Sequence, residues 1–185
     1  MALPIPSQPN LPTPSQNPAN SILDQFNRQT YLGNAYSFPI GPQTVNSTAE
    51  TPIGLIVNPL TSGGAQNLKA LFNNLRTTAS DNASGDGTSF FRYYINPTIA
   101  TLGTQTIPVN CRPASNLTSV SNCYVSGQFT VSANGTLWRS IMAGYSAIDD
   151  SALLLVLDPG QSLLITVECV TSGSQIINAS SFYEI

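Results

Sequence analysis

Short apolar runs separated by Gly, Pro, Asn and Ser dominate the chain from about residue 51 onward. Runs of this length and spacing are typical of the strands of a β-sandwich or barrel. As an upper count, nine stretches fit: Ile53–Asn58, Leu68–Thr78, Ser89–Ile95, Thr104–Val109, Tyr124–Val131, Leu137–Ala143, Ala152–Leu157, Ser162–Val170 and Gln175–Tyr183. We therefore predict an all-β domain over residues 51–185, built as a jelly-roll-like β-sandwich.

Two segments of this pattern carry a specific local prediction. Leu68–Thr78 has apolar residues at helical spacing, but the glycines before it and the threonines at its end favour a strand, which we predict. Asp158-Pro159-Gly160 predicts a tight turn, because proline presets a backbone dihedral and glycine accepts a positive φ. We expect this turn to join Ala152–Leu157 and Ser162–Val170 into a hairpin that supplies central core strands.

The aromatic residues of Ser89–Ile95 raise the question of what covers each face of this strand. Alternation places Phe91 and Tyr93 on one face and Phe90 and Tyr94 on the other. At least one face must therefore be covered by something other than the sandwich core. One interpretation is an arm or a neighbouring subunit, since Tyr and Phe are enriched at interfaces. The other is an exposed aromatic platform that binds a glycan.

The first eighteen residues hold six of the fourteen prolines. Each proline removes a backbone donor and pushes its predecessor toward extended geometry, so this segment is neither a helix interior nor a central strand. We predict an extended, Pro-rich N-terminal arm over residues 1–50, with Ser21 capping a short helix over Ile22–Gln29. Twenty residues in a polyproline conformation reach on the order of 60 Å, far enough to touch a neighbour.

Apolar side chains recur along this arm, and they would find cover only on a partner or on the domain. We take the following as partner-binding anchors: Leu3, Ile5, Leu11, Ile22, Leu23, Phe26 and Tyr31. Two other interpretations stay open here. Residues 1–20 would form a solvated tail in the first. In the second, Pro6, Pro9 and Pro12 match the spacing of an SH3-type ligand, although no basic residue lies within reach to orient it.

Charge and histidine content exclude several classes of function. The 185 residues include six basic and nine acidic side chains and no histidine, which gives a net charge of −3. Without histidine the usual general base, the Ser–His and Cys–His dyads and the commonest transition-metal ligand are absent. Lys69, the single lysine, lies in no catalytic motif. We therefore predict that the protein is not an enzyme and uses no cofactor.

The basic residues are also scattered along an acidic chain, so we expect neither nucleic acid nor a membrane as a partner. The N-terminus has no basic or apolar region of a secretory signal. The longest apolar run, Ala152–Leu157, is far too short to span a bilayer. These features predict synthesis as a soluble protein in the cytoplasm of the cell that makes it.

Cysteines and acidic residues show no metal-binding pattern. Cys111, Cys123 and Cys169 cannot all pair within one chain, and we expect free, mostly buried thiols, with a Cys111–Cys123 disulfide as the alternative. The Asp81–Gly87 loop lacks the acidic residues of an EF-hand, so we interpret it as a turn, although it offers oxygen atoms to calcium. Asp149-Asp150 is interpreted as part of a solvated loop. We predict no metal site.

Short motifs in the β-rich part carry a resemblance to a known class of protein. They are Asn58-Pro59-Leu60-Thr61-Ser62-Gly63-Gly64-Ala65-Gln66-Asn67-Leu68, Ile95-Asn96-Pro97-Thr98, Gly103-Thr104, Pro108-Val109-Asn110 and Leu157-Asp158-Pro159-Gly160-Gln161-Ser162-Leu163. Together, over roughly residues 53–185, they resemble small β-sandwich virion proteins of tailed bacteriophages. The resemblance implies no catalytic residue, and it does not extend to residues 1–50.

Proteins of that class serve as capsid decoration (cement) proteins, head fibres or tail-associated parts, usually as trimers. The resemblance thus implies a virion protein on the capsid surface, with the major capsid protein and further copies of itself, as a homotrimer, for partners. The low charge agrees with this, because desolvating Ser, Thr and Asn in a contact costs less than desolvating ions. The alternative function is a phage head-fibre or tail-associated module that binds a receptor or glycan, and a hydrolase is the third.

Overall fold

The computed structural model describes residues 27–45, 48–60, 70–81, 89–143, 148–149, 155–169 and 174–184. Strands dominate this part of the chain, and its only helical residues are 27–32. The strands are β1 (Ala35–Val45), β2 (Thr51–Val57), β3 (Ala70–Asp81), β4 (Ser89–Ile95), β5 (Thr98–Leu102), β6 (Val109–Asn110), β7 (Asn122–Val125), β8 (Phe129–Ala133), β9 (Thr136–Ala143), β10 (Ile148–Asp149), β11 (Leu155–Leu157), β12 (Ser162–Cys169) and β13 (Ser174–Glu184). The all-β class expected from the sequence is confirmed.

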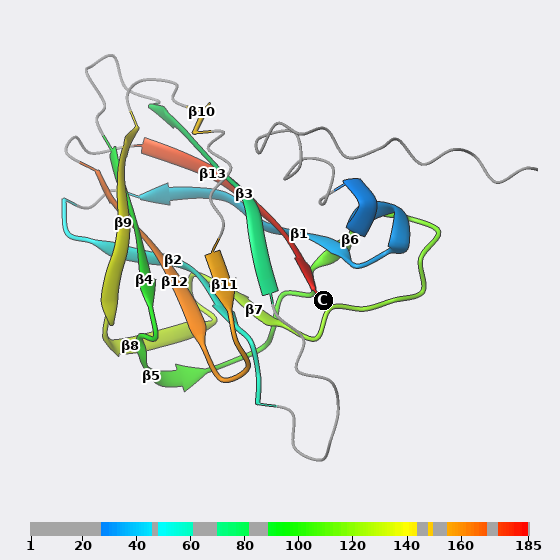
Figure 1. The fold of residues 1–185 in the computed structure, drawn as a ribbon. Helices are drawn as coiled ribbons and strands as arrows, with labels where there is room; N and C mark the ends of the chain where they lie inside the picture. Colours follow the sequence, from blue (N-terminus) through cyan, green and yellow to red (C-terminus); the bar gives the residue numbers. More distant parts are fainter. Residues whose placement is uncertain are drawn as a thin grey trace, which may run out of the picture.

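The strands form three antiparallel sheets (Figure 1). Sheet A has the order β10-β3-β13-β1-β6, and β11 also pairs with β3. Sheet B has the order β7-β2-β12-β4-β9. Sheet C is the pair β5 and β8. Neighbours within sheets A and B are mostly distant in sequence, so most of the pairing is long-range.

One apolar core is shared by sheets A and B. Sheet A contributes Phe38 of β1 and Phe182 of β13, and sheet B contributes Phe91 of β4 and Ile165 of β12; all four side chains are fully buried. Because these residues belong to a single packed cluster, the inner faces of the two sheets are buried against each other.

The central strand of sheet B, β12, is buried on both faces. Leu163 and Ile165 belong to the shared core, whereas Leu164 belongs to a second apolar cluster. That second cluster also contains Leu55 of β2 and Phe129 of β8, so sheet C covers part of the outer face of sheet B. Burial on both faces explains why β12 contains three consecutive apolar residues, Leu163 to Ile165, instead of a strictly alternating pattern.

The strand predictions are confirmed to different extents. Ser89–Ile95 coincides with β4, and Leu68–Thr78 corresponds to the strand β3 and not to a helix. Tyr124–Val131 was predicted as one strand, but it is divided into β7 and β8 by a turn in which Gly127 has a φ of 82°. Thr104–Val109 contains only an isolated bridge at Thr106 and the start of β6.

The turn at Asp158-Pro159-Gly160 forms as predicted, with Gly160 at a φ of 87° and a hydrogen bond from Gln161 N to Asp158 O of 3.0 Å. The expected hairpin is wrong, however, because β11 pairs with β3 in sheet A while β12 lies in sheet B. Both sides of β12 are already occupied, by β2 and by β4, so β11 has no ladder to join there. The turn therefore crosses between the two sheets.

The sheet-forming part of the chain begins earlier than residue 51. β1 lies within the range expected to be an arm, yet it pairs with β13 from Ala35 to Val45. Pro39 and Pro42 fit in this strand because it lies next to the sheet edge and has a bulge between Pro39 and Gly41. Residues 35–45 therefore belong to sheet A, which corrects the boundary expected at residue 50.

Gly135, between β8 and β9, provides a test of this backbone arrangement. Its φ is 86°, and an added Cβ would lie 2.4 Å from Ile95 O and 2.7 Å from Asn96 O. Gly127 has a φ of 82° but nothing within 4 Å of an added Cβ, so it is the matched control. Gly127→Ala should cost about 1 kcal/mol of unfolding free energy through backbone strain alone.

Gly135→Ala should cost clearly more, about 3 kcal/mol, because the backbone of the β4–β5 connection must also shift. Urea unfolding of both variants, followed by circular dichroism, measures the difference. Equal losses for the two variants would contradict the close approach of Gly135 to the end of β4.

Candidate functional site

Most of the predicted partner-binding anchors lie outside the described residues. This holds for Leu3, Ile5, Leu11, Ile22, Leu23 and Phe26. Tyr31 is described, and it lies in the helical segment 27–32 with 68% of its surface exposed. The predicted helix over Ile22–Gln29 overlaps this segment, which extends beyond Gln29 to Leu32 and then ends at Gly33.

Tyr31 belongs to an exposed surface formed by the end of the helix and the loop after β6. The guanidinium of Arg112 lies over the Tyr31 ring, 5.4 Å from its centroid, and its Nη1 donates a hydrogen bond of 2.6 Å to Tyr31 O. Leu32 and Leu117 are about half exposed, at 48% and 51%. We call these four residues the Tyr31 surface. It offers apolar area and one cation directly beside the chain segment that leads to residue 26.

Asn110 fixes the two halves of the Tyr31 surface to each other. Its Nδ2 donates hydrogen bonds to Gly33 O at 2.7 Å and to Leu117 O at 3.0 Å. Gly33 has a φ of 83°, which ends the helix in the left-handed conformation that glycine adopts readily. The helix end is thus held against the loop that carries Arg112, and the surface is preorganised.

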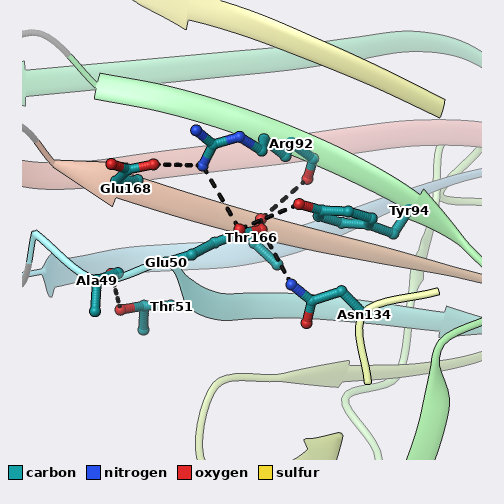
Figure 2. Close-up of polar contacts among 8 residues, drawn as sticks. All are labelled: Ala49, Glu50, Thr51, Arg92, Tyr94, Asn134, Thr166 and Glu168. Atoms are coloured by element: carbon teal, nitrogen blue, oxygen red, sulfur yellow. Dashed lines mark hydrogen bonds and ion pairs between the residues drawn. The ribbon is translucent and has the colours of Figure 1, made fainter. Parts of the chain in front are cut away.

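The largest group of interacting polar side chains in the described part of the chain surrounds Glu50, on the outer side of sheet B (Figure 2). Glu50 Oε1 accepts hydrogen bonds from Thr166 Oγ1 of β12 and from Asn134 Nδ2 at 3.3 Å. Glu50 Oε2 accepts one from Tyr94 Oη of β4 at 3.1 Å. This Glu50 cluster therefore connects the segment before β2, two strands of sheet B and the β8–β9 turn.

Arg92 is the cation beside the Glu50 cluster, and it faces two carboxylates. Its guanidinium forms ion pairs with Glu168 and, at 3.6 Å, with Glu50 Oε2. The hydrogen bond to Glu168 is the main cause of a raised Arg92 pKa. Burial is the main cause of a raised pKa at Tyr94, and the hydrogen bond to Glu50 adds to it. Tyr94 therefore stays neutral, as a donor, well above neutral pH.

The arrangement of the Glu50 cluster favours a structural role over a catalytic one. The carboxylate is the acceptor for three neutral donors and faces one cation, so little of its capacity is left for a substrate. Thr166 donates its hydroxyl hydrogen to this carboxylate, and the sequence has no histidine that would activate the hydroxyl as a nucleophile. Within the described residues, no group of His, Cys, Asp and Glu has the arrangement of a metal site.

Glu184, at the end of β13, forms a second carboxylate contact of similar kind. Its side chain is buried, and it accepts hydrogen bonds from Ser119 Oγ at 2.7 Å, from Val120 N at 3.0 Å and from Ser121 N at 3.0 Å. These donors belong to the loop that precedes β7 in sheet B. Glu184 thus connects the end of β13, in sheet A, to the start of β7, an edge strand of sheet B.

Two of the three thiols are described, and both are free, as expected. Cys111 is half-buried and Cys123 is fully buried. Burial raises the pKa of both thiols, and at Cys123 the nearby charge of Glu184 raises it further. Both therefore remain protonated and weakly nucleophilic near neutral pH. The alternative of a Cys111–Cys123 disulfide is wrong for this structure.

The aromatic residues of β4 alternate as predicted. Phe91 and Tyr93 are fully buried in the shared core, and Trp138 packs edge-on against Tyr93 with ring centroids 6.4 Å apart. On the other face Tyr94 packs against the second apolar cluster, which includes Phe129 of sheet C. We expected an arm or a neighbouring subunit to cover one face of β4. Sheet C of the same chain covers part of that face instead.

Several other sequence predictions fall outside the described residues. Lys69, residues 82–87 of the Asp81–Gly87 loop and Asp150 are among them. No described helix is long and apolar enough to cross a membrane. No protein-family model matches the chain, and no curated protein matches it either. No relative therefore adds to the resemblance drawn from the short motifs.

Sequence reasoning missed both carboxylate contacts. Glu50, Arg92 and Glu168 are separated by 42 and 76 positions, and only the pairing of β4 with β12 brings the last two together. Glu184 lies next to the end of the chain, where nothing in the local pattern marks it as buried. The small number of charged residues was the one signal in the sequence that could have indicated these contacts. In a chain with so few charges, an acidic side chain is a good candidate for a specific hydrogen-bonding or ion-pair partner.

The Glu184 contact predicts a large difference between two carboxylates. Glu184→Gln removes the charge and replaces one acceptor oxygen by a donor, which leaves the part-buried amide of Val120 and the buried amide of Ser121 without full satisfaction. We expect a loss of about 1–3 kcal/mol of unfolding free energy. Glu168→Gln, the control, removes a partly exposed ion pair with Arg92 and should cost less than about 1 kcal/mol. Thermal or urea unfolding measures both, and a smaller loss at Glu184 than at Glu168 would refute the assignment.

Proposed function

We propose that this chain is a structural protein of a virus particle, a capsid decoration protein of tailed-phage type with a jelly-roll β-sandwich. The observation that carries the proposal is the order in which strands enter the sheets. The first four strands alternate between the sheets: β1 and β3 lie in sheet A, and β2 and β4 lie in sheet B. β9 also lies in sheet B. The chain then alternates again, with β11 in sheet A, β12 in sheet B and β13 in sheet A. This alternation is that of two interleaved Greek keys, an architecture that viral capsid proteins share with lectins.

Fold alone does not assign function, so the surface has to agree with it. Only 8% of residues are charged, and nine large apolar side chains of the described part are exposed, among them Tyr31 at 68%, Ile107 at 77% and Leu60 at 78%. A surface of this kind loses little by permanent desolvation against other subunits, because few ions have to be removed from water.

In this proposal the chain binds the major capsid protein and adjacent copies through its N-terminal residues. The anchors named from the sequence are Leu3, Ile5, Leu11, Ile22, Leu23 and Phe26, and they precede the helix that presents Tyr31. Because β1 starts at Ala35, the segment available for this purpose is shorter than residues 1–50. The Tyr31 surface lies close in sequence to residue 27, the first residue that the structure describes.

The aromatic residues on which the glycan-binding alternative depends are not exposed as a platform. Tyr93 is fully buried, Trp138 packs against the core, and the Tyr94 hydroxyl is bound to Glu50. Carbohydrate recognition by stacking requires exposed aromatic faces, and the described part of β4 and β9 does not offer them together.

A truncation tests the role of the N-terminal residues. The variant lacking residues 2–26 keeps every described strand, so it should remain folded by circular dichroism and lose binding to the expanded capsids of the parent particle. The triple substitution Leu3→Ser, Ile5→Ser and Leu11→Ser should weaken binding in the same direction. Leu60→Ser removes an exposed apolar side chain of the described domain. It is the control and should bind normally, because in this proposal the contact with the capsid is made by the N-terminal residues.

Co-sedimentation of purified protein with capsids measures binding of all four proteins. Undiminished binding by the truncated variant would refute the arm's role. Failure of the full-length protein to bind any capsid would refute the proposed function as a whole.

A further inference from the structure

Among the described residues, the outer edge of sheet B is the one long sheet edge that has neither a proline nor a covering strand. β9 forms this edge, pairs with β4 on one side, and has no further described strand on the other (Figure 1). It is eight residues long and contains one charged residue, Arg139, with no proline and no glycine, and its register with β4 shifts once, at Trp138. A long edge of this composition is a template for pairing with another strand.

The other edges of sheets A and B are covered or interrupted. At one end of sheet A, β6 has two residues, and β1 beyond it carries Pro39 and Pro42 beside a bulge. At the other end, β3 pairs with both β10 and β11. The second edge of sheet B, β7, has an isolated bridge between Cys123 and Thr106. Short strands, prolines, bulges and covering segments are the devices by which proteins close sheet edges.

The side chains of β9 are also incompletely covered. Leu137 is 51% exposed, and Trp138 and Ile141 pack against the shared core while remaining partly accessible. Apolar residues that reach the core from an edge strand gain burial when the sheet is extended by one more strand. The edge thus combines hydrogen-bonding capacity with apolar area.

We propose that β9 pairs antiparallel with β9 of a second copy of this chain, which joins two B sheets into one continuous sheet across a twofold axis. A strand can pair with its own symmetry mate only in the antiparallel sense, and such a contact needs no second kind of open edge. A ring of three copies would need two complementary open edges, and the described edges provide one.

Two further observations favour a second copy over another extended segment of the same chain. The N-terminal eighteen residues contain six prolines, which cannot donate the regular series of backbone hydrogen bonds that a new edge strand must supply. β9 carries a single charge, so antiparallel self-pairing brings little like charge together. The inference goes beyond the proposed function and does not rest on it. It also differs from the threefold arrangement that the resemblance implies.

Sedimentation of the purified full-length protein over a range of concentrations tests this contact. We expect a reversible monomer–dimer equilibrium. The double variant Leu137→Lys and Ser140→Lys places charge at two exposed positions of the edge and should raise the dimer dissociation constant about tenfold or more. Val109→Lys, at an exposed apolar position on the edge strand β6, is the matched control and should leave the equilibrium unchanged.

Trp138 gives a second readout, because it is the single tryptophan and lies on β9. Its emission should move to longer wavelength when the wild-type protein is diluted, and this change should be lost in the double variant. If the double variant does not fold, hydrogen exchange of the wild type decides the question: β9 amides should gain protection with rising concentration while β1 amides do not.

A wild-type protein that is monomeric at every concentration, or trimeric, would overturn the proposal. So would a dimer that Leu137→Lys and Ser140→Lys leave intact. Capsid binding is measured separately, so a failure here does not bear on the function proposed above.

Discussion

Burial of one apolar layer between sheets A and B is the constraint on which the other features of the structure depend. β12 lies in the middle of sheet B and β13 lies between β1 and β3 in sheet A, so both sheets are organised around strands from the C-terminal end of the chain. Every neighbour of these strands comes from a distant part of the sequence. The chain must therefore be nearly complete before the core can close, as expected for a fold rich in non-local contacts.

Electrostatics supplement this core at two points. Glu50 with Arg92 and Glu168 ties the entry of β2 to the outer face of sheet B, and Glu184 ties the end of sheet A to the loop before β7. These four charged residues make contacts between secondary-structure elements. Because the chain has few other charges, much of its surface is uncharged. Such a surface is suited to contacts with other subunits, which is the property that the proposed function and the proposed β9 pairing share.

The sequence predicted strands best where apolar residues are dense and turn residues mark the ends, as in Ser89–Ile95 and Ser162–Val170. It failed for β1, because Pro39 and Pro42 are typical of an extended arm, although Tyr36, Phe38 and Ile40 alternate as in a half-buried strand. Sheet membership was not predictable locally: the hairpin expected at Asp158-Pro159-Gly160 requires a free side of β12. The Glu50 cluster depends on strand register, which no local pattern specifies.

Amide hydrogen exchange of the full-length protein tests the central claim that β1 is part of the folded core and not of an arm. Peptides covering Ala35–Val45 and Ser162–Cys169 should both exchange slowly, with opening free energies close to that of global unfolding, because each strand is paired within a sheet and borders the same apolar layer. Rapid exchange of Ala35–Val45 beside slow exchange of Ser162–Cys169 would contradict the shared core described above.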